Sequence, residues 1–125
     1  MIVGKHTSEY ELRILGTSGF LSGTAGGTAI TDSTFNFYSA ANRNQWYYVA
    51  YVFNDAANFH ALYRNGVVAA SGANSGTVSN QATEFWIGRD PQLNSATFFG
   101  RLDEVRILSR ALQTSEVAGD YNDLR

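Results

Sequence analysis

Two glutamates, Glu9 and Glu11, have the spacing that acid-base chemistry on a sugar would need. Residues two apart in a strand project from the same face, and retaining glycosidases use two carboxyl groups about 5–5.5 Å apart. Arg13 continues this polar face, however, and apolar residues alternate with all three. An alternating strand of this kind normally turns its charges to water. We therefore expect Glu9 and Glu11 to lie on a solvated face, and glycoside hydrolysis ranks third among the functions considered.

The two histidines, His6 and His60, are the other residues with catalytic potential. His60 falls in a stretch expected to be extended, and the sequence places no serine, cysteine or carboxylate partner beside it. A histidine without such a partner is usually structural or solvated. We assign no catalytic residue and expect that the protein is not an enzyme.

Aromatic side chains are the main resource for binding, because the chain has seven tyrosines and two tryptophans. Such rings can stack on the apolar faces of sugars, while amide and guanidinium groups bond the hydroxyls. Five residues are predicted to meet on the concave face of a sheet and to bind a ligand there: Tyr47, Tyr51, Tyr63, Arg64 and Trp86. The alternative is that these rings pack in the core or in a subunit interface, since aromatic residues dominate both.

Length and composition indicate a single small domain over residues 1–125. Only 16% of the residues are charged, and Gly, Ser, Thr and Asn take their place, which favours short strands joined by polar turns. The net charge of −2 offers no basic field for nucleic acid. No apolar run approaches the roughly 18 residues of a membrane span, and the N-terminus lacks the apolar core of a signal peptide. With no cysteine, disulfides and thiolate metal sites are excluded.

Hydrophobic periodicity predicts short strands and one helix. Residues 45–53 have no polar face, which predicts a strand covered on both sides. The pair Asn65-Gly66 is a strong signal for a tight hairpin turn. Further strands are expected over residues 9–14, 28–38, 59–63, 84–89 and 98–108, with a hairpin region at 16–27, a bend at Gly100 and a helix over 115–122 capped by Thr114.

Four phrases stand in a fixed order along the chain: QWYYVA at 45–50, LYRNG at 62–66, FWIG at 85–88 and FFGRLDEVRILSRAL at 98–112. Together they resemble the signature of laminin G-like domains in the concanavalin A-like lectin and glucanase superfamily. The resemblance implies an all-β fold, an antiparallel jelly-roll sandwich with one short C-terminal helix. It also implies that the last phrase forms a strand of the sheet, and that Val105 and Ile107 point into the core, as Phe85 and Ile87 are expected to do.

Domains of this family are usually longer, and Met1 aligns with a strand inside the fold. We therefore expect the first strands to be missing, so that the chain completes its sheets with another copy of itself or is part of a longer polypeptide.

The resemblance implies a non-enzymatic binding module that recognises carbohydrate or a protein surface, in an extracellular or cell-surface setting. The alternative is a structural or oligomerising unit of an adhesin, a phage or a cell-surface assembly. Calcium is the one cofactor considered, because relatives often hold it at a loop rim. Its candidate ligands are Asp55 and Asp90, although neither belongs to a spaced acidic set.

Overall fold

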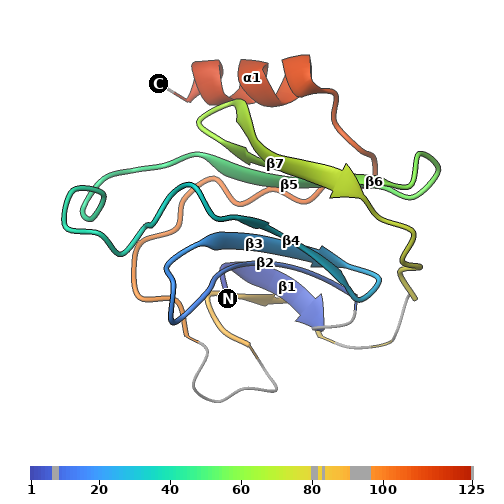
Figure 1. Cartoon of the computed structure of the whole chain (residues 1–125), viewed down its shortest axis with the longest axis horizontal. Coiled ribbons are helices and arrows are strands. Elements are labelled where there is room, and N and C mark those ends of the chain that lie inside the picture. The colour runs from blue at the N-terminus through green and yellow to red at the C-terminus, as the bar shows by residue number, and fades with distance from the viewer. Residues whose placement is uncertain (7–8, 80–81, 83, 91–96, 125) are drawn as a thin grey trace.

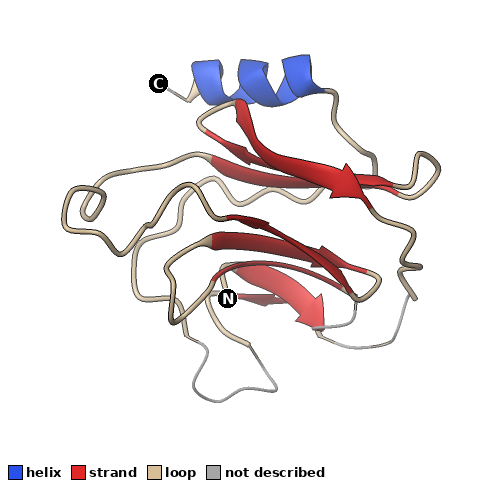
Figure 2. Ribbon diagram, viewed as in Figure 1, coloured by secondary structure: helices blue, strands red, loops and turns tan. Residues whose placement is uncertain are grey.

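Two antiparallel sheets pack face to face, and one helix covers the outer face of the smaller sheet (Figures 1 and 2). The computed structural model describes residues 1–6, 9–79, 82, 84–90 and 97–124. The elements are β1 (Val3–His6), β2 (Tyr10–Ile14), β3 (Leu21–Ala25), β4 (Thr28–Asp32), β5 (Val49–Asn54), β6 (Phe59–Arg64), β7 (Val67–Ala73), β8 (Trp86–Ile87) and α1 (Thr114–Asp123). This arrangement confirms the predicted sandwich with a short C-terminal helix.

The larger sheet has the strand order β4-β3-β2-β1-β8. Its registers set Ile14 opposite Leu21 and Leu21 opposite Asp32, so these residues lie in line at one end of the sheet. At the other end, Tyr10 lies opposite Ala25 and Ala25 opposite Thr28. We call the end that holds Ile14, Leu21 and Asp32 the rim.

The smaller sheet has the order β5-β6-β7. Asn65 and Gly66 join β6 to β7 with φ angles of 51° and 78°, the left-handed values that a type I′ turn needs, as the sequence predicts. The Asn65 amide oxygen also accepts a 3.1 Å hydrogen bond from the Tyr48 N–H. The turn therefore fixes the start of β5 as well as its own hairpin.

Both faces of the smaller sheet are covered at β5 and β6, as predicted for the part of the apolar stretch that forms β5; Gln45 and Trp46 of that stretch are exposed. Leu62 is fully buried between the sheets with Leu12 and Leu21 of the larger sheet. Residues of the opposite face, Ala61 and Tyr63, are buried against Val117 of α1. Alternate side chains of β6 therefore pack into two different cores, one on each face of the sheet.

The predicted strand at 98–108 is wrong, because none of these residues lies in a strand; the bridge between Arg89 and Thr97 ends just before them. Phe98 and Leu102 instead pack against the core between the sheets. Glu104 has a φ of 49°, which breaks an extended path. The core positions predicted for Val105, Ile107, Phe85 and Ile87 are also wrong, since their exposed fractions are 40%, 58%, 36% and 53%.

The helix begins one residue earlier than predicted. Gln113 is its N-cap, and the Glu116 carboxylate accepts a 2.8 Å hydrogen bond from the Gln113 N–H. Hydrogen bonds from Arg110 and from that N–H lower the pKa of Glu116 to about 2. Thr114 is therefore not the cap; its hydroxyl lies 3.1 Å from the Tyr63 hydroxyl and ties the helix to β6.

Gly23 tests the contact between the sheets. A Cβ atom there would lie 2.4 Å from Cδ2 of the Tyr51 ring, so Gly23→Ala should lower the free energy of unfolding by about 1–3 kcal/mol through overpacking. Gly16→Ala is the matched control, because a Cβ at Gly16 has no atom within 4 Å. Urea unfolding of both variants checks this, and equal stability of the two would contradict the packing described.

Candidate functional site

Two of the predicted ligand-binding tyrosines lie on opposite faces of the smaller sheet. Tyr51 packs into the core between the sheets. Tyr63 is only 2% exposed and lies beneath the helix. The prediction that both share a concave binding face is therefore wrong, because β5 and β6 pair with Tyr51 opposite Leu62 and leave Tyr63 on the other side of the pleat.

Tyr51 belongs to a buried polar network around His60. Its hydroxyl lies 3.0 Å from His60 Nδ1, and the Asn74 amide nitrogen lies 3.1 Å from the same atom. Asn74 also donates to the carbonyl of Ala25 on the opposite sheet, at 3.1 Å. Burial raises the pKa of Tyr51 to about 12 and lowers the pKa of His60. This network joins the two sheets at the end away from the rim, and it holds His60 buried between Tyr51 and Asn74.

Tyr47 and Arg64 both contact Phe35, a residue that the sequence did not single out. The rings of Tyr47 and Phe35 lie 5.2 Å apart, centre to centre, and the Arg64 guanidinium lies 4.2 Å from the centre of the Phe35 ring. Arg64 also pairs with Asp32, which is 1% exposed. Asp32 in turn accepts a 3.0 Å hydrogen bond from the Thr34 N–H. Arg64 therefore joins β6 to β4 at the rim, and we call its ion pair with Asp32 the clamp.

Trp86 lies on the other sheet. Its partner across β1 is Gly4, whose own partner across β2 is Glu11, so all three positions share the outer face of the larger sheet. The indole N–H donates to Glu84 at 3.1 Å. The five predicted binding residues thus divide among the outer face of the larger sheet, the two faces of the smaller sheet and the rim.

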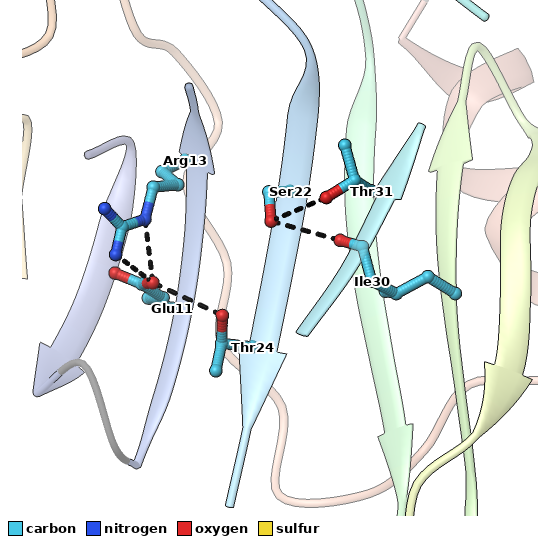
Figure 3. Close-up of polar contacts among 6 residues, drawn as sticks. All are labelled: Glu11, Arg13, Ser22, Thr24, Ile30 and Thr31. Atoms are coloured by element: carbon cyan, nitrogen blue, oxygen red, sulfur yellow. Dashed lines mark hydrogen bonds and ion pairs between the residues drawn. The ribbon is translucent and has the colours of Figure 1, made fainter. Parts of the chain in front are cut away.

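Glu9 and Glu11 are buried, with exposed fractions of 0% and 3%, so the predicted solvated face is wrong. One Glu11 oxygen accepts hydrogen bonds from Arg13 at 2.5 and 2.7 Å and from the Thr24 hydroxyl at 3.3 Å (Figure 3). Glu9 lies 3.4 Å from the Lys5 ammonium. Each carboxylate therefore has a basic neighbour, which is why the polar face of β2 tolerates burial.

The same polar face continues across β3 and β4. The Ser22 hydroxyl donates to the Ile30 carbonyl at 3.1 Å and lies 3.3 Å from the Thr31 hydroxyl (Figure 3). Ser22 and Thr24 are only 4% and 7% exposed, so this face makes contacts within the protein.

The calcium candidates lie in different surroundings. Asp55 is exposed in the turn between β5 and β6, whereas Asp90 is 2% exposed. Among the described residues, no group of three or more His, Cys, Asp or Glu side chains could hold a metal ion. Calcium binding through Asp55 or Asp90 stays a prediction.

The loop between β4 and β5, residues 33–48, carries two exposed aromatic rings, Tyr38 and Trp46, and we call it the rim loop (left side of Figure 1). Its own polar groups hold it. The Asn36 side chain accepts from the Tyr38 N–H at 2.7 Å, the Asn42 side chain donates to the Asn36 carbonyl at 2.8 Å, and the Tyr47 hydroxyl donates to the Asn42 carbonyl at 3.2 Å. On this framework Trp46 is 65% exposed and Tyr38 is 42% exposed.

A shallow hollow of about 110 Å³ opens beside Tyr38, and we call it the rim hollow. It is lined by Met1, Ile14, Tyr38, Thr97, Phe98 and Phe99. Phe98 is anchored in the core between the sheets, whereas its neighbour Phe99 is 95% exposed. The hollow therefore has an apolar, partly aromatic lining and an aromatic edge that faces water.

Sequence reasoning missed Tyr38, Trp46 and Phe99. Trp46 belongs to the phrase at 45–50, which lies in the predicted strand at 45–53, but β5 begins only at Val49. A signal was available, because Arg43, Asn44 and Gln45 precede Trp46 and are typical of a turn rather than a buried strand. All three are exposed.

Comparison with known proteins identifies the class. The sequence model of the laminin G-like group of the concanavalin A-like lectin/glucanases superfamily matches residues 1–118. The chain therefore belongs to this family, as the signature phrases predict. None of the curated proteins matches it.

A solved structure shares the fold. The crystal structure of an S-layer domain-containing protein from Clostridium thermocellum (residues 221–444) superposes with a TM-score of 0.57 at 16% sequence identity. The match covers 91% of this chain but 64% of that one. Within the described residues, no helix has the length and apolar character needed to cross a membrane.

The buried His60 predicts a loss of stability in mild acid. Its pKa in the folded state lies below the ordinary 6.5, so unfolding takes up a proton once the pH falls below that value. The stabilising effect is complete above about pH 6.5 and declines as the pH falls toward the folded-state pKa. Melting temperatures between pH 7.5 and 5 should fall for the native sequence and change less for His60→Gln. Parallel profiles would contradict a buried neutral histidine.

The clamp between Asp32 and Arg64 predicts a second effect on stability. Asp32→Asn should lower the free energy of unfolding by about 2–3 kcal/mol, because Arg64 loses a charged partner that is itself buried. Glu104→Gln is the control, since the pair of Glu104 with Arg106 is more than half exposed on both sides and should contribute less than about 1 kcal/mol. Guanidinium unfolding measures both variants, and equal losses would rule out the clamp.

Proposed function

We propose that the protein is a non-catalytic binding module, and that it recognises carbohydrate with the aromatic rings of its rim. The observation that carries the proposal is the exposure of Trp46 and Phe99, at 65% and 95%, on segments that are otherwise held in place. A large aromatic ring left in water on an ordered framework is a common feature of binding surfaces. Membership of a lectin-containing superfamily supports the same function.

The chemistry of the rim fits sugar. The ring faces of Trp46, Tyr38 and Phe99 offer apolar planes for the C–H face of a pyranose. The exposed side chains of Arg43 and Asn44 stand beside Trp46 in the sequence and offer donors and acceptors for hydroxyl groups. Since the rim loop is already hydrogen-bonded, binding costs little ordering entropy.

The size of the rim hollow limits the mode of recognition. Sites that enclose a whole small molecule usually measure about 300–1,000 Å³, whereas the hollow measures about 110 Å³. The hollow therefore suits one sugar ring or one side chain resting at the surface. Shallow contact of this kind supports reversible binding.

The carboxylates once considered for hydrolysis have other partners. Glu11 is held by Arg13 and Thr24, and Glu9 pairs with Lys5. Both carboxylates are buried beside a basic side chain, so neither lies open to a substrate. These contacts support the binding role over glycoside hydrolysis.

The proposal extends to the location of the protein and to calcium binding. We propose an extracellular or cell-surface setting, in keeping with the family and with the S-layer protein that shares the fold. Asp55 and Asp90 are the proposed ligands for calcium, and a chelator in the binding assay tests whether the ion contributes.

A second candidate function, an oligomerising unit, is favoured by a separate observation. Val105, Ile107 and Leu108 are 40%, 58% and 52% exposed on a segment that pairs with no strand in the described residues. This surface does not include the rim, so the two functions can be tested independently.

Glycan-array screening, followed by titration calorimetry with the best oligosaccharide, tests the rim. Trp46→Ala and Phe99→Ala should each weaken binding by about tenfold or more, since stacking of a ring is worth about 1–3 kcal/mol in comparable contacts. Melting temperatures should stay near that of the native chain, because both rings are largely in water.

Phe59→Ala is the matched control for these variants. Phe59 is 39% exposed but begins β6, at the end away from the rim. An array with no bound glycan, or a Phe59→Ala variant that loses as much affinity as Trp46→Ala, would refute sugar recognition at the rim. An added arm with a chelator separates any contribution of calcium.

A further inference from the structure

Residues 101–109 form an unpaired segment whose sequence is complementary to itself, and we call it the pairing segment. Its sequence is RLDEVRILS. None of its residues forms a ladder with a strand in the described part of the chain, and Glu104 has a left-handed φ of 49°. A segment with this composition and alternation favours the extended state. The segment therefore has the composition of a strand but no partner strand in the described part of the chain.

We propose that the pairing segment binds the same segment of a second copy, as an antiparallel two-stranded ribbon centred on Val105. In that register each residue faces the one equally distant from Val105 on the other strand. Glu104 then faces Arg106 of the second copy. Leu102 stays packed against its own core, so the ribbon spans residues 103–107. The pair of Glu104 with Arg106 occurs twice in the ribbon, because the two copies are related by a two-fold axis.

Charge complementarity is the argument for a copy of this chain as the partner. Two cross-strand ion pairs form between Glu104 and Arg106, on side chains that are 56% and 54% exposed and thus available. Within one chain Arg106 lies 3.5 Å from Glu104 and 3.8 Å from Asp120, both toward the outer limit of an ion pair. Residues directly opposite in a ribbon approach more closely than residues two apart along one strand. The symmetric ribbon therefore improves the pairing of both charges.

The apolar side chains of the segment add to the ribbon. Val105 lies on the two-fold axis and meets its own copy, and Ile107 projects from the same face of the ribbon. Both are at least 40% exposed in the single chain, so pairing removes apolar surface from water. A contact of one strand is small compared with a standard protein interface, and we expect a weak, concentration-dependent dimer.

Cysteine cross-linking tests the register directly, because the native chain has no cysteine. In the proposed ribbon the two copies of residue 105 are direct neighbours, within the range in which a disulfide can form. The two copies of residue 107 are offset by four residues, about 13 Å along the ribbon, which is too far. Val105→Cys should therefore form a disulfide dimer under mild oxidation, and Ile107→Cys should not.

The different exposure of Val105 and Ile107 makes the comparison of the two cysteine variants a strict test of the register. Ile107 is more exposed than Val105, at 58% against 40%, so cross-linking by random collision would favour Ile107→Cys. Equal or faster dimer formation by Ile107→Cys would overturn the proposal. So would a native chain that remains monomeric in analytical ultracentrifugation up to its highest soluble concentration.

A charge exchange provides a second test that does not use oxidation. Glu104→Arg and Arg106→Glu each place like charges opposite one another and should raise the dimer dissociation constant by at least tenfold. The double variant with both changes restores opposite charges and should recover most of the affinity. Failure of this recovery, with melting temperatures unchanged, would refute the register. Neither test depends on what the rim binds.

Discussion

The inward face of β6 is the constraint on which the sandwich depends, because its three inward side chains each make a different contact with the opposite sheet. Leu62 packs fully buried against Leu12 and Leu21 in the middle. At one end, His60 binds Asn74, which donates to the Ala25 carbonyl. At the other end, Arg64 pairs with Asp32. An apolar centre with a polar contact at each end fixes both the distance between the sheets and their lateral position.

The functional surface follows from the rim end of this arrangement. Asp32 ends β4, and the loop that leaves it is held by Thr34 and Phe35 against Asp32 and Arg64. The rim loop can then present Trp46 and Tyr38 to water without collapsing onto the core. The covered polar face of the larger sheet makes contacts within the protein instead. The proposed binding surface is thus a loop positioned by a rigid scaffold, which is the usual division of roles in β-sandwiches.

Much of the fold could be predicted from the sequence, because its strongest signals are local. Asn65-Gly66 adopts the predicted turn, and the apolar stretch that includes Val49 and Val52 is covered on both sides. The segment at 98–108 failed because alternation shows which residues share a face but not whether a partner strand is present. The site failed for a related reason. Tyr51 and Tyr63 have the right chemistry for a ligand, but burial of each depends on contacts with Gly23 and α1 that no local pattern contains.

The indole N–H signals in a nitrogen-15 NMR spectrum give the most direct test of the account. The chain has two tryptophans, so two such signals are expected. Trp46 is exposed on the rim loop, whereas the indole of Trp86 is bonded to Glu84 on the other sheet. Titration with a binding oligosaccharide should shift the Trp46 signal and leave the Trp86 signal in place. A shift of Trp86 alone would contradict recognition at the rim.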